Sequence, residues 1–168
     1  EAIVRAVDWM AQNDVPVVNI SLAGPQNKIL RRGLEAATQN GLIVIAAAGN
    51  QGPAAPPLYP AAYPFTIAVT AVDSKMEVYP RALQGTQIDI AAPGVDVLVR
   101  SQDRLRIVSG TSAAAVFVTS AVAADASLQS PPNANALRTK FAAQSLDLGP
   151  AGRDTVYGYG LVRASGGC

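Results

Sequence analysis

A serine hydroxyl at position 112 is the first group in this sequence that could attack a substrate. Ser112 follows Gly110 and Thr111 and opens a run of small apolar residues, which predicts a helix over about residues 112–128. The unpaired N–H groups and the dipole at a helix N-terminus stabilise negative charge, such as the charge on an acyl oxygen under attack. The same residues also fit an ordinary helix start, because serine is a common N-cap.

Asn50 is a second candidate, at the end of the apolar run "LIVIAAAGN". Open α/β sheets place their sites at the carboxyl ends of strands, and a neutral amide is a good donor to an oxyanion. A plain Asn-Gln-Gly turn explains this residue equally well. The segment "NISLAGP", residues 19–25, is either a strand-to-helix connection or an exposed edge that pairs with an extended peptide.

The elements that must position these residues alternate between strand and helix. Apolar runs predict buried strands at residues 15–22, 42–49, 65–72 and 86–94, and helices are predicted at 1–14, 27–40, 112–128 and 131–145. Ile29, Leu30, Leu34 and Ala37 form the apolar stripe of the second helix, and Gly41 suits its C-cap. Strand, helix and strand with short connections predict parallel pairing. Residues 95–110 predict a surface hairpin, and the glycine-rich tail is expected to loop back onto the sheet.

Composition restricts the classes of function. Of 168 residues 49% are hydrophobic and 15% charged, which indicates one globular domain over residues 1–168. The net charge of +1 gives no electrostatic reason to expect nucleic acid or a membrane as a partner. No apolar run is long enough to span a bilayer. Cys168 is the only cysteine, so no internal disulfide forms.

Six segments together resemble successive blocks of the subtilisin-like serine proteases, the subtilases. These segments are "VVNISLAGP", "IVIAAAGNQG", "YPAAYPFTIAVTAVD", "IDIAAPG", "SGTSAAA" and "YGYGLV". The resemblance implies a three-layer α/β fold, a mostly parallel sheet flanked by helices and incomplete at its N-terminal side. It also implies Ser112 as nucleophile and Asn50 as oxyanion donor, partnered by the Ser112 N–H, with an often cis turn at Tyr59-Pro60. Ser21, Leu22, Ala23 and Gly24 match the segment that pairs with substrate, and Ala47, Ala48 and Gly49 match one wall of the pocket for the residue before the cleaved bond.

The chain departs from this family in lacking any histidine. The catalytic Asp and His of the family lie before the helix that opens this chain, and a serine without a base is a poor nucleophile. The three lysines, Lys28, Lys75 and Lys140, lie away from Ser112 in the family layout. Val116 and Phe117 replace the usual proline and histidine. We therefore expect an inactive isolated chain, completed by an upstream fragment or partner chain into a serine endopeptidase acting on peptides or proteins.

Other interpretations lead to different expectations. A non-catalytic subtilase relative would keep the same groove as a peptide-binding or scaffolding module. A nucleotide-binding α/β domain is disfavoured, because neither a G-x-G-x-x-G nor a Walker loop is present. No cofactor is predicted, although some family members hold a weak structural cation near the segment matching Tyr59–Tyr63. By the same resemblance, an extracellular or periplasmic location is expected.

Overall fold

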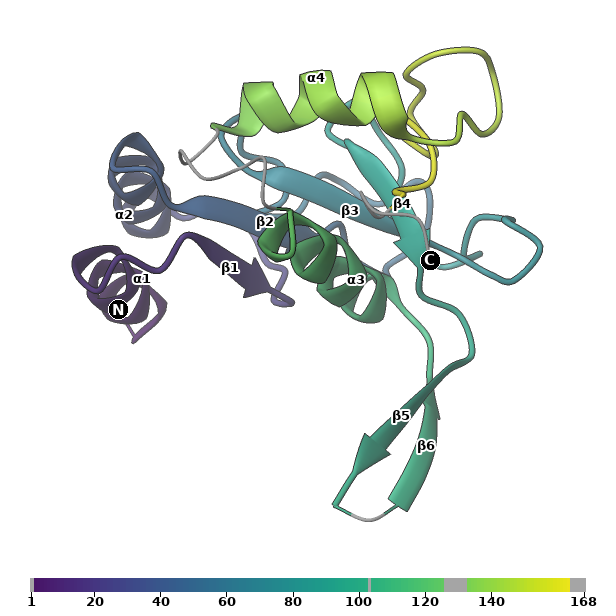
Figure 1. The fold of residues 1–168 in the computed structure, drawn as a ribbon, viewed down its shortest axis with the longest axis horizontal. Helices are drawn as coiled ribbons and strands as arrows, with labels where there is room; N and C mark the ends of the chain where they lie inside the picture. Colours follow the sequence, from purple (N-terminus) through teal and green to yellow (C-terminus); the bar gives the residue numbers. More distant parts are fainter. Residues whose placement is uncertain (1, 103, 126–132, 164–168) are drawn as a thin grey trace.

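A four-stranded parallel sheet forms the centre of the computed structural model, which describes residues 2–102, 104–125 and 133–163. Its strands are β1 (Val17–Ile20), β2 (Ile43–Ala47), β3 (Ile67–Val72) and β4 (Ile90–Pro93), and they lie in that order across the sheet (Figure 1). All three strand pairs are parallel, which confirms the predicted pairing. The strand predicted at residues 86–94 begins only at Ile90, because the Ile88 N–H turns back to donate to the Gly85 carbonyl.

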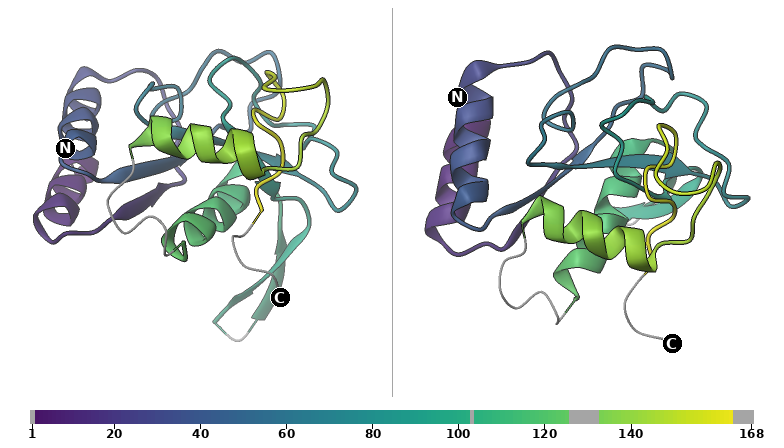
Figure 2. Two further views of the ribbon diagram at one scale, coloured as in Figure 1. Left: turned by 45° about the horizontal axis from the view of Figure 1, so that its top comes forward. Right: turned by 90° about the horizontal axis from the view of Figure 1, so that it is seen from above.

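Helices cover both faces of the sheet, so the predicted three-layer arrangement is confirmed (Figure 2). The helices are α1 (Ala2–Gln12), α2 (Lys28–Gln39), α3 (Thr111–Ala123) and α4 (Ala134–Gln144). On one face, Val7 of α1 and Leu34 of α2 pack into a cluster with Val44 of the sheet. On the other face, Val118 of α3 and Leu137 of α4 pack with the side chains that alternate to that side. The part of the predicted 112–128 helix beyond residue 125 lies outside the described residues.

Local signals set the ends of α2. The Asn27 side chain accepts hydrogen bonds from the N–H groups of Ile29 and Leu30, and Gly41 follows the helix with a φ of 94°. The prediction that Ile29 points inward is wrong, since Ile29 is 63% exposed. Ile29 lies about 100° around the helix from Leu30, which packs against the core, so Ile29 is at the margin of the apolar stripe. Leu34 and Ala37 are buried as predicted.

The glycine-rich tail returns to the sheet beside β4, as predicted. The N–H of Ala91 donates to the Gly160 carbonyl, and the Val162 N–H donates back to the Ala91 carbonyl. Leu161 therefore forms a parallel bridge with Ala91 at the outer side of β4. The tail continues the hydrogen-bond ladder at that edge. It thereby occupies backbone groups of β4 that could otherwise pair with another chain.

Substituting Gly160 with alanine is expected to lower the free energy of unfolding by about 2 kcal/mol or more. Gly160 has a φ of 100°, and a Cβ there would lie 2.1 Å from the Leu146 carbonyl oxygen. Urea denaturation would measure the loss. Gly152→Ala is the matched control, because Gly152 has a φ of 84° but no atom within 4 Å of a Cβ. Equal losses in the two variants would contradict the steric argument.

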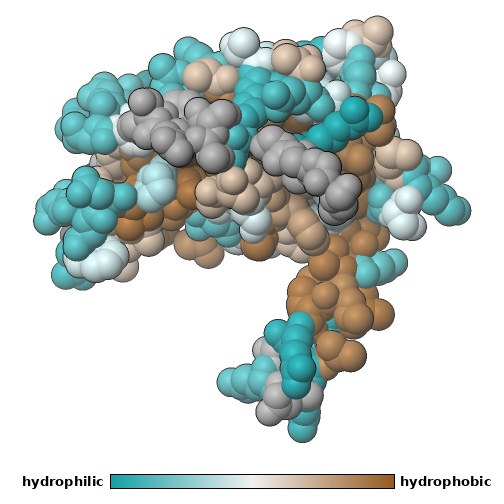
Figure 3. All heavy atoms as spheres, in the orientation of Figure 1, coloured by the Kyte–Doolittle hydropathy of each residue, from teal (hydrophilic) through white to brown (hydrophobic). Residues whose placement is uncertain are grey.

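A hairpin of β5 (Val97–Ser101) and β6 (Arg104–Val108) extends from the body of the molecule (Figures 1 and 3). Its base is closed by the Gly110 N–H, which donates to the Gly94 carbonyl at 2.7 Å. Apolar side chains cover much of its surface, and Leu98, Leu105 and Ile107 are each more than 60% exposed. None of the helices in the described ranges is both long and apolar enough to cross a membrane.

Candidate functional site

Ser112 lies in the first turn of α3, where the chain returns from the hairpin. Gly110 occupies the N-cap position without a capping side chain, and its φ is 148°. A Cβ on Gly110 would lie 2.9 Å from the Asn50 Nδ2 atom. Glycine at position 110 therefore allows the Asn50 amide to approach the backbone immediately before Thr111 and Ser112.

Thr111 joins the two candidate residues. Its backbone N–H and its Oγ1 hydroxyl both donate to the Asn50 Oδ1 atom, at 3.0 and 3.1 Å. The same Oγ1 accepts a hydrogen bond from the Gly49 N–H at 3.1 Å. Because Oδ1 takes both donors, the NH₂ end of the Asn50 amide is the end directed toward Gly110.

Two N–H donors are found at the start of α3, one beside Gly110 and one two residues further along the chain. One is Asn50 Nδ2, and the other is the Ser112 N–H, which as a first-turn group has no acceptor within the helix. A carbonyl oxygen held between them would be stabilised as it gains negative charge. Ser112 and Asn50, separated by 62 positions in the chain, are therefore linked through Thr111. Thr111 was not among the site residues predicted from the sequence, although its place between Gly110 and Ser112 was the available signal.

The Ser21–Gly24 segment lies along one side of this point. The Ser21 hydroxyl donates to the Ser112 carbonyl at 3.3 Å and accepts from the Asn19 Nδ2 atom at 3.0 Å. Gly24 uses both its N–H and its carbonyl in an antiparallel bridge with Tyr59. Over the described ranges, Leu22 and Ala23 make no backbone hydrogen bond. Their main chain is therefore the part of this segment open to a ligand.

The Ala47–Gly49 segment lies at the carboxyl end of β2. Ala47 and Ala48 are 3% and 1% exposed, so their side chains belong to the core rather than to an open cavity. Gly49 has a φ of 115°, and its carbonyl accepts from the Leu83 N–H at 3.0 Å. Any wall that this segment offers to a ligand is therefore made by its backbone.

An apolar hollow lies next to Ser112, between the hairpin and α3. It is lined by Val97, Leu98, Val99, Val108, Ser109, Ser112, Ala113, Val116 and Phe117. Val116 and Phe117, the two departures from the family pattern, are 51% and 43% exposed. None of these lining residues can act as a general base, so the hydroxyl of Ser112 has no activating partner on this side.

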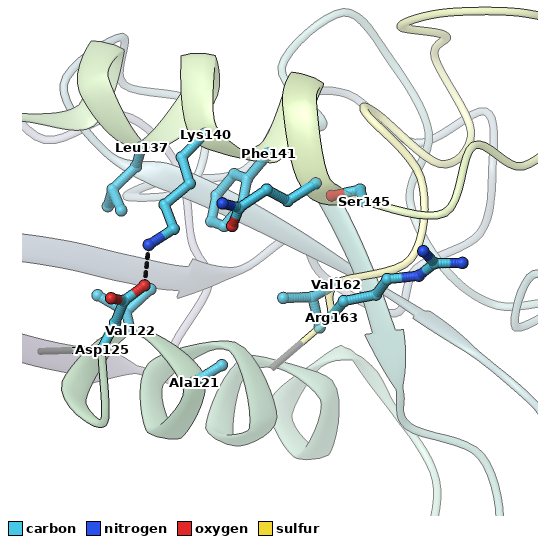
Figure 4. A pocket seen from close by; sticks show the side chains of 10 residues that line it. Ala121, Val122, Asp125, Leu137, Lys140, Phe141, Ser145, Val162 and Arg163 are labelled. Carbon is cyan, nitrogen blue, oxygen red and sulfur yellow. Dashed lines mark hydrogen bonds and ion pairs between the residues drawn. The ribbon is translucent and has the colours of Figure 1, made fainter. Parts of the chain in front are cut away.

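A second hollow, between α3 and α4, lies at the far end of α3 from Ser112 (Figure 4). Lys140 of α4 and Asp125, just after α3, form an ion pair across it. This pairing joins the two helices and keeps Lys140 away from Ser112. Apolar side chains such as Leu137 and Phe141 make up much of the remaining lining, together with Gln144, Ser145 and Arg163.

The residues with described positions contain no group of three or more His, Cys, Asp or Glu side chains that could hold a metal ion. The weak cation that some family members hold near the segment matching Tyr59–Tyr63 was not predicted for this chain. The turn itself has the predicted cis peptide between Tyr59 and Pro60.

Together, the fold and site define an α/β protein with a serine at a helix N-terminus and a side-chain amide beside it. The chain belongs to the subtilase family, whose model matches residues 1–160. The resemblance seen in the sequence is thus confirmed over nearly the whole chain.

Two individual proteases are similar to this chain over nearly its whole length. The chain is 32% identical over 166 residues to the Minor extracellular protease Epr of Bacillus subtilis (strain 168), and the match covers 97% of this chain and 26% of that protein. It is 33% identical to Subtilisin DY of Bacillus licheniformis, covering 96% of this chain and 60% of the relative. The chain therefore spans less than two thirds of the length of either relative.

Solved structures show the same fold. A cold-adapted subtilisin-like serine proteinase superposes with a TM-score of 0.85 at 25% identity, over 98% of this chain and 61% of that one. The prenylagaramide maturation protease PagA has a TM-score of 0.82 at 24% identity, over 96% of this chain and 64% of its own. The latter similarity concerns the fold alone.

Proposed function

We propose that this chain forms the nucleophile and oxyanion part of a serine endopeptidase that cleaves extended peptides through an acyl-enzyme. Ser112 supplies the attacking hydroxyl, and Asn50 Nδ2 with the Ser112 N–H holds the carbonyl oxygen. The free backbone of Leu22 and Ala23 pairs with the substrate chain. Subtilase membership and the names of the relatives, proteases and subtilisins, support this proposal.

The observation that carries the proposal is the three-residue network of Gly49, Asn50 and Thr111. An oxyanion donor is effective when its direction is set before the reaction. The two hydrogen bonds from Thr111 to Oδ1 set the direction of the Asn50 NH₂ group. These bonds satisfy the N–H of Thr111, the first residue of α3, and leave the Asn50 NH₂ group on the side of Gly110.

The general base and its acidic partner are proposed to come from upstream segments or from a partner chain. The sequence has no histidine, and the hollow beside Ser112 offers an apolar surface on which a further segment can pack. Strand β1 has a single neighbour, β2, within the described part of the sheet, which leaves a second edge for added strands. We refer to the chain together with these added segments as the assembled protease.

Labelling of Ser112 with a fluorophosphonate tests this proposal. We expect negligible labelling of the chain alone and labelling in the assembled protease that Ser112→Ala abolishes. Intact mass and peptide mapping would identify the modified residue. Failure of Ser112 to react in the assembled protease would overturn the proposed function, and fast Ser112-dependent peptide turnover by the chain alone would overturn the need for a supplied base.

Thr111→Val is expected to lower kcat of the assembled protease by about tenfold, because one of the two hydrogen bonds that orient Asn50 is lost. Thr111→Ser keeps the hydroxyl and should retain most of the activity. Steady-state kinetics on both variants would measure the difference. If valine and serine reduced kcat equally, the hydroxyl would not be the group that orients Asn50.

The absence of histidine also supports a second candidate, a peptide-binding or scaffolding module without catalysis. This module would use the same free backbone at Leu22 and Ala23. Incubation with peptides, followed by measurement of binding and cleavage, distinguishes the two functions. A scaffold binds peptides with the same affinity in the wild type and in Ser112→Ala. It also leaves the peptides intact, even when candidate upstream segments are added.

An extracellular or periplasmic location forms part of the proposal. One relative carries an extracellular location in its name, the Minor extracellular protease Epr. Fractionation of the native host followed by detection of the protein would test this location.

A further inference from the structure

The hairpin of β5 and β6 has two different faces. Residues that pair across an antiparallel ladder share a face, so Leu98 and Ile107 lie on one side, together with Leu105. We call these three residues the outer face of the hairpin, and they are 62%, 68% and 68% exposed. The other side carries half-buried valines that line the hollow beside Ser112. A contiguous set of large exposed apolar side chains, such as the outer face, marks a surface for binding.

Strand β6 also has a free backbone edge. Within the described ranges, β5 and β6 pair only with each other, so β6 has a single neighbour. Alternate residues of an antiparallel strand direct their N–H and carbonyl groups away from that neighbour. No backbone hydrogen bond joins β6 to a third segment in the part of the chain that the structure describes. An extended segment can therefore add to β6 as a third strand.

Two arginines alternate with the outer-face residues along β6. Arg104 and Arg106 are exposed and lie on the opposite side of the strand from Leu105 and Ile107. Neither guanidinium belongs to an ion pair among the described residues. Residues opposite each other on neighbouring strands share a face, and pairs of opposite charge stabilise the sheet. A third strand with acidic residues beside the two arginines would therefore place its intervening residues beside Leu105 and Ile107.

Neither a lipid bilayer nor a second copy of the chain suits this surface. Figure 3 shows hydrophobic side chains over the middle of the hairpin and hydrophilic ones at its end. Insertion into a bilayer would carry that charged end into hydrocarbon ahead of the apolar part, which is unfavourable. In a second copy, β6 paired with itself about its central residue would place Arg106 beside Arg106, and like charges directly opposite are destabilising.

We propose that β6 binds an extended segment of another polypeptide, added as a third strand of the hairpin, in which apolar residues alternate with aspartate or glutamate. The apolar residues pack beside the outer face, and the carboxylates pair with Arg104 and Arg106. Main-chain hydrogen bonds along the free edge supply affinity, and the alternation supplies specificity. This surface contains none of the residues of the proposed nucleophile and oxyanion site, so the inference does not depend on the proposed function.

A hexapeptide that alternates glutamate and valine, with both ends blocked, tests the inference in an NMR titration of the isotopically labelled chain. We expect amide shifts concentrated at β6, and weaker binding of the corresponding lysine–valine hexapeptide. Arg104→Glu combined with Arg106→Glu should weaken binding of the glutamate peptide by about 2- to 30-fold, the effect of losing two cross-strand charge pairs. The same double variant should bind the lysine peptide more tightly than the wild type does, which would also show that its hairpin is folded.

Arg5→Glu combined with Arg32→Glu is the matched control, because it makes the same change of charge at exposed positions of α1 and α2. Its affinities for both peptides should equal those of the wild type. Equal affinities of the wild type for the two peptides would overturn the inference, and so would amide shifts at Leu22 and Ala23 without shifts at β6.

Two further measurements test the other partners. Sedimentation of the chain would detect pairing of two copies, and flotation with vesicles of phosphatidylserine and phosphatidylcholine would detect binding to lipid. We expect a monomer that does not float with the vesicles. Dimers or vesicle binding that the double variant at Arg104 and Arg106 abolishes would assign this surface to a second copy or to lipid, and would overturn the inference.

Discussion

Asp89→Ala lowers the free energy of unfolding by about 3–5 kcal/mol, the expected loss when one partner of a buried ion pair is removed. Asp89 is fully buried, and its carboxylate accepts from Arg138 Nε at 2.8 Å, from Arg138 Nη2 at 3.1 Å and from Arg153 Nη2 at 3.1 Å. It also accepts from the Ala68 N–H at 3.0 Å. Without Asp89, two guanidinium groups would remain beside the sheet with no anion.

The loss is large because this carboxylate connects several parts of the fold. Arg138 belongs to α4 and also donates to the Pro64 and Thr66 carbonyls, and Arg153 holds the tail against the Thr86 and Ile88 carbonyls. A domain of this size has a total stability of about 5–15 kcal/mol, so the variant would lose a large share of it. Guanidinium chloride denaturation would measure the change.

Two variants separate this effect from a general loss of charge. Glu35→Ala removes a carboxylate whose pair with Arg31 is exposed and 4.0 Å long, and should change the stability by less than about 1 kcal/mol. Asp89→Asn keeps one acceptor oxygen but turns an NH₂ group toward the donors, so it should recover little. A stable Asp89→Asn protein would show that the charge of Asp89 is dispensable.

Asn50→Ala is expected to lower kcat of the assembled protease by about 10²–10³-fold with little change in KM, the range found when one oxyanion donor is removed from a subtilisin. The reason is that the donor acts on charge that exists only in the transition state. Steady-state kinetics with a peptide substrate would separate the two constants. Asn13→Ala, which removes an exposed amide from the end of α1, is the matched control and should leave both constants unchanged.

A rise in KM with an unchanged kcat would contradict this assignment, because it would place Asn50 in ground-state binding. Asn50→Ala also removes the acceptor of Thr111, so the thermal midpoint should be measured beside the kinetics. A loss of kcat in a protein that is folded at the assay temperature would isolate the oxyanion role.

Local patterns determined much of the fold. Buried runs of β-branched and small residues predicted strands that became β1 to β3, and Gly41 ended α2 as a C-cap should. Two predictions from these patterns were wrong, the burial of Ile29 and the start of β4. Periodicity placed Ile29 beside the apolar stripe of α2, but it does not say how wide a part of the helix surface the core covers, and Ile29 at the margin of that stripe is exposed. The start of β4 likewise depended on a turn at Gly85–Ile88 that alternation does not reveal.

The sequence by itself also determined the family of this protein, and with it Ser112 and Asn50 as residues to examine. Only the tertiary structure decided how Asn50 is held, through its contacts with Thr111, and how the tail and α4 are joined to the sheet, through the contacts of Asp89 with two arginines. These partners lie 49 to 64 positions apart in the sequence. Propensity and spacing act over a few residues, whereas the packing of sheet, helices and returning loops sets which distant side chains meet.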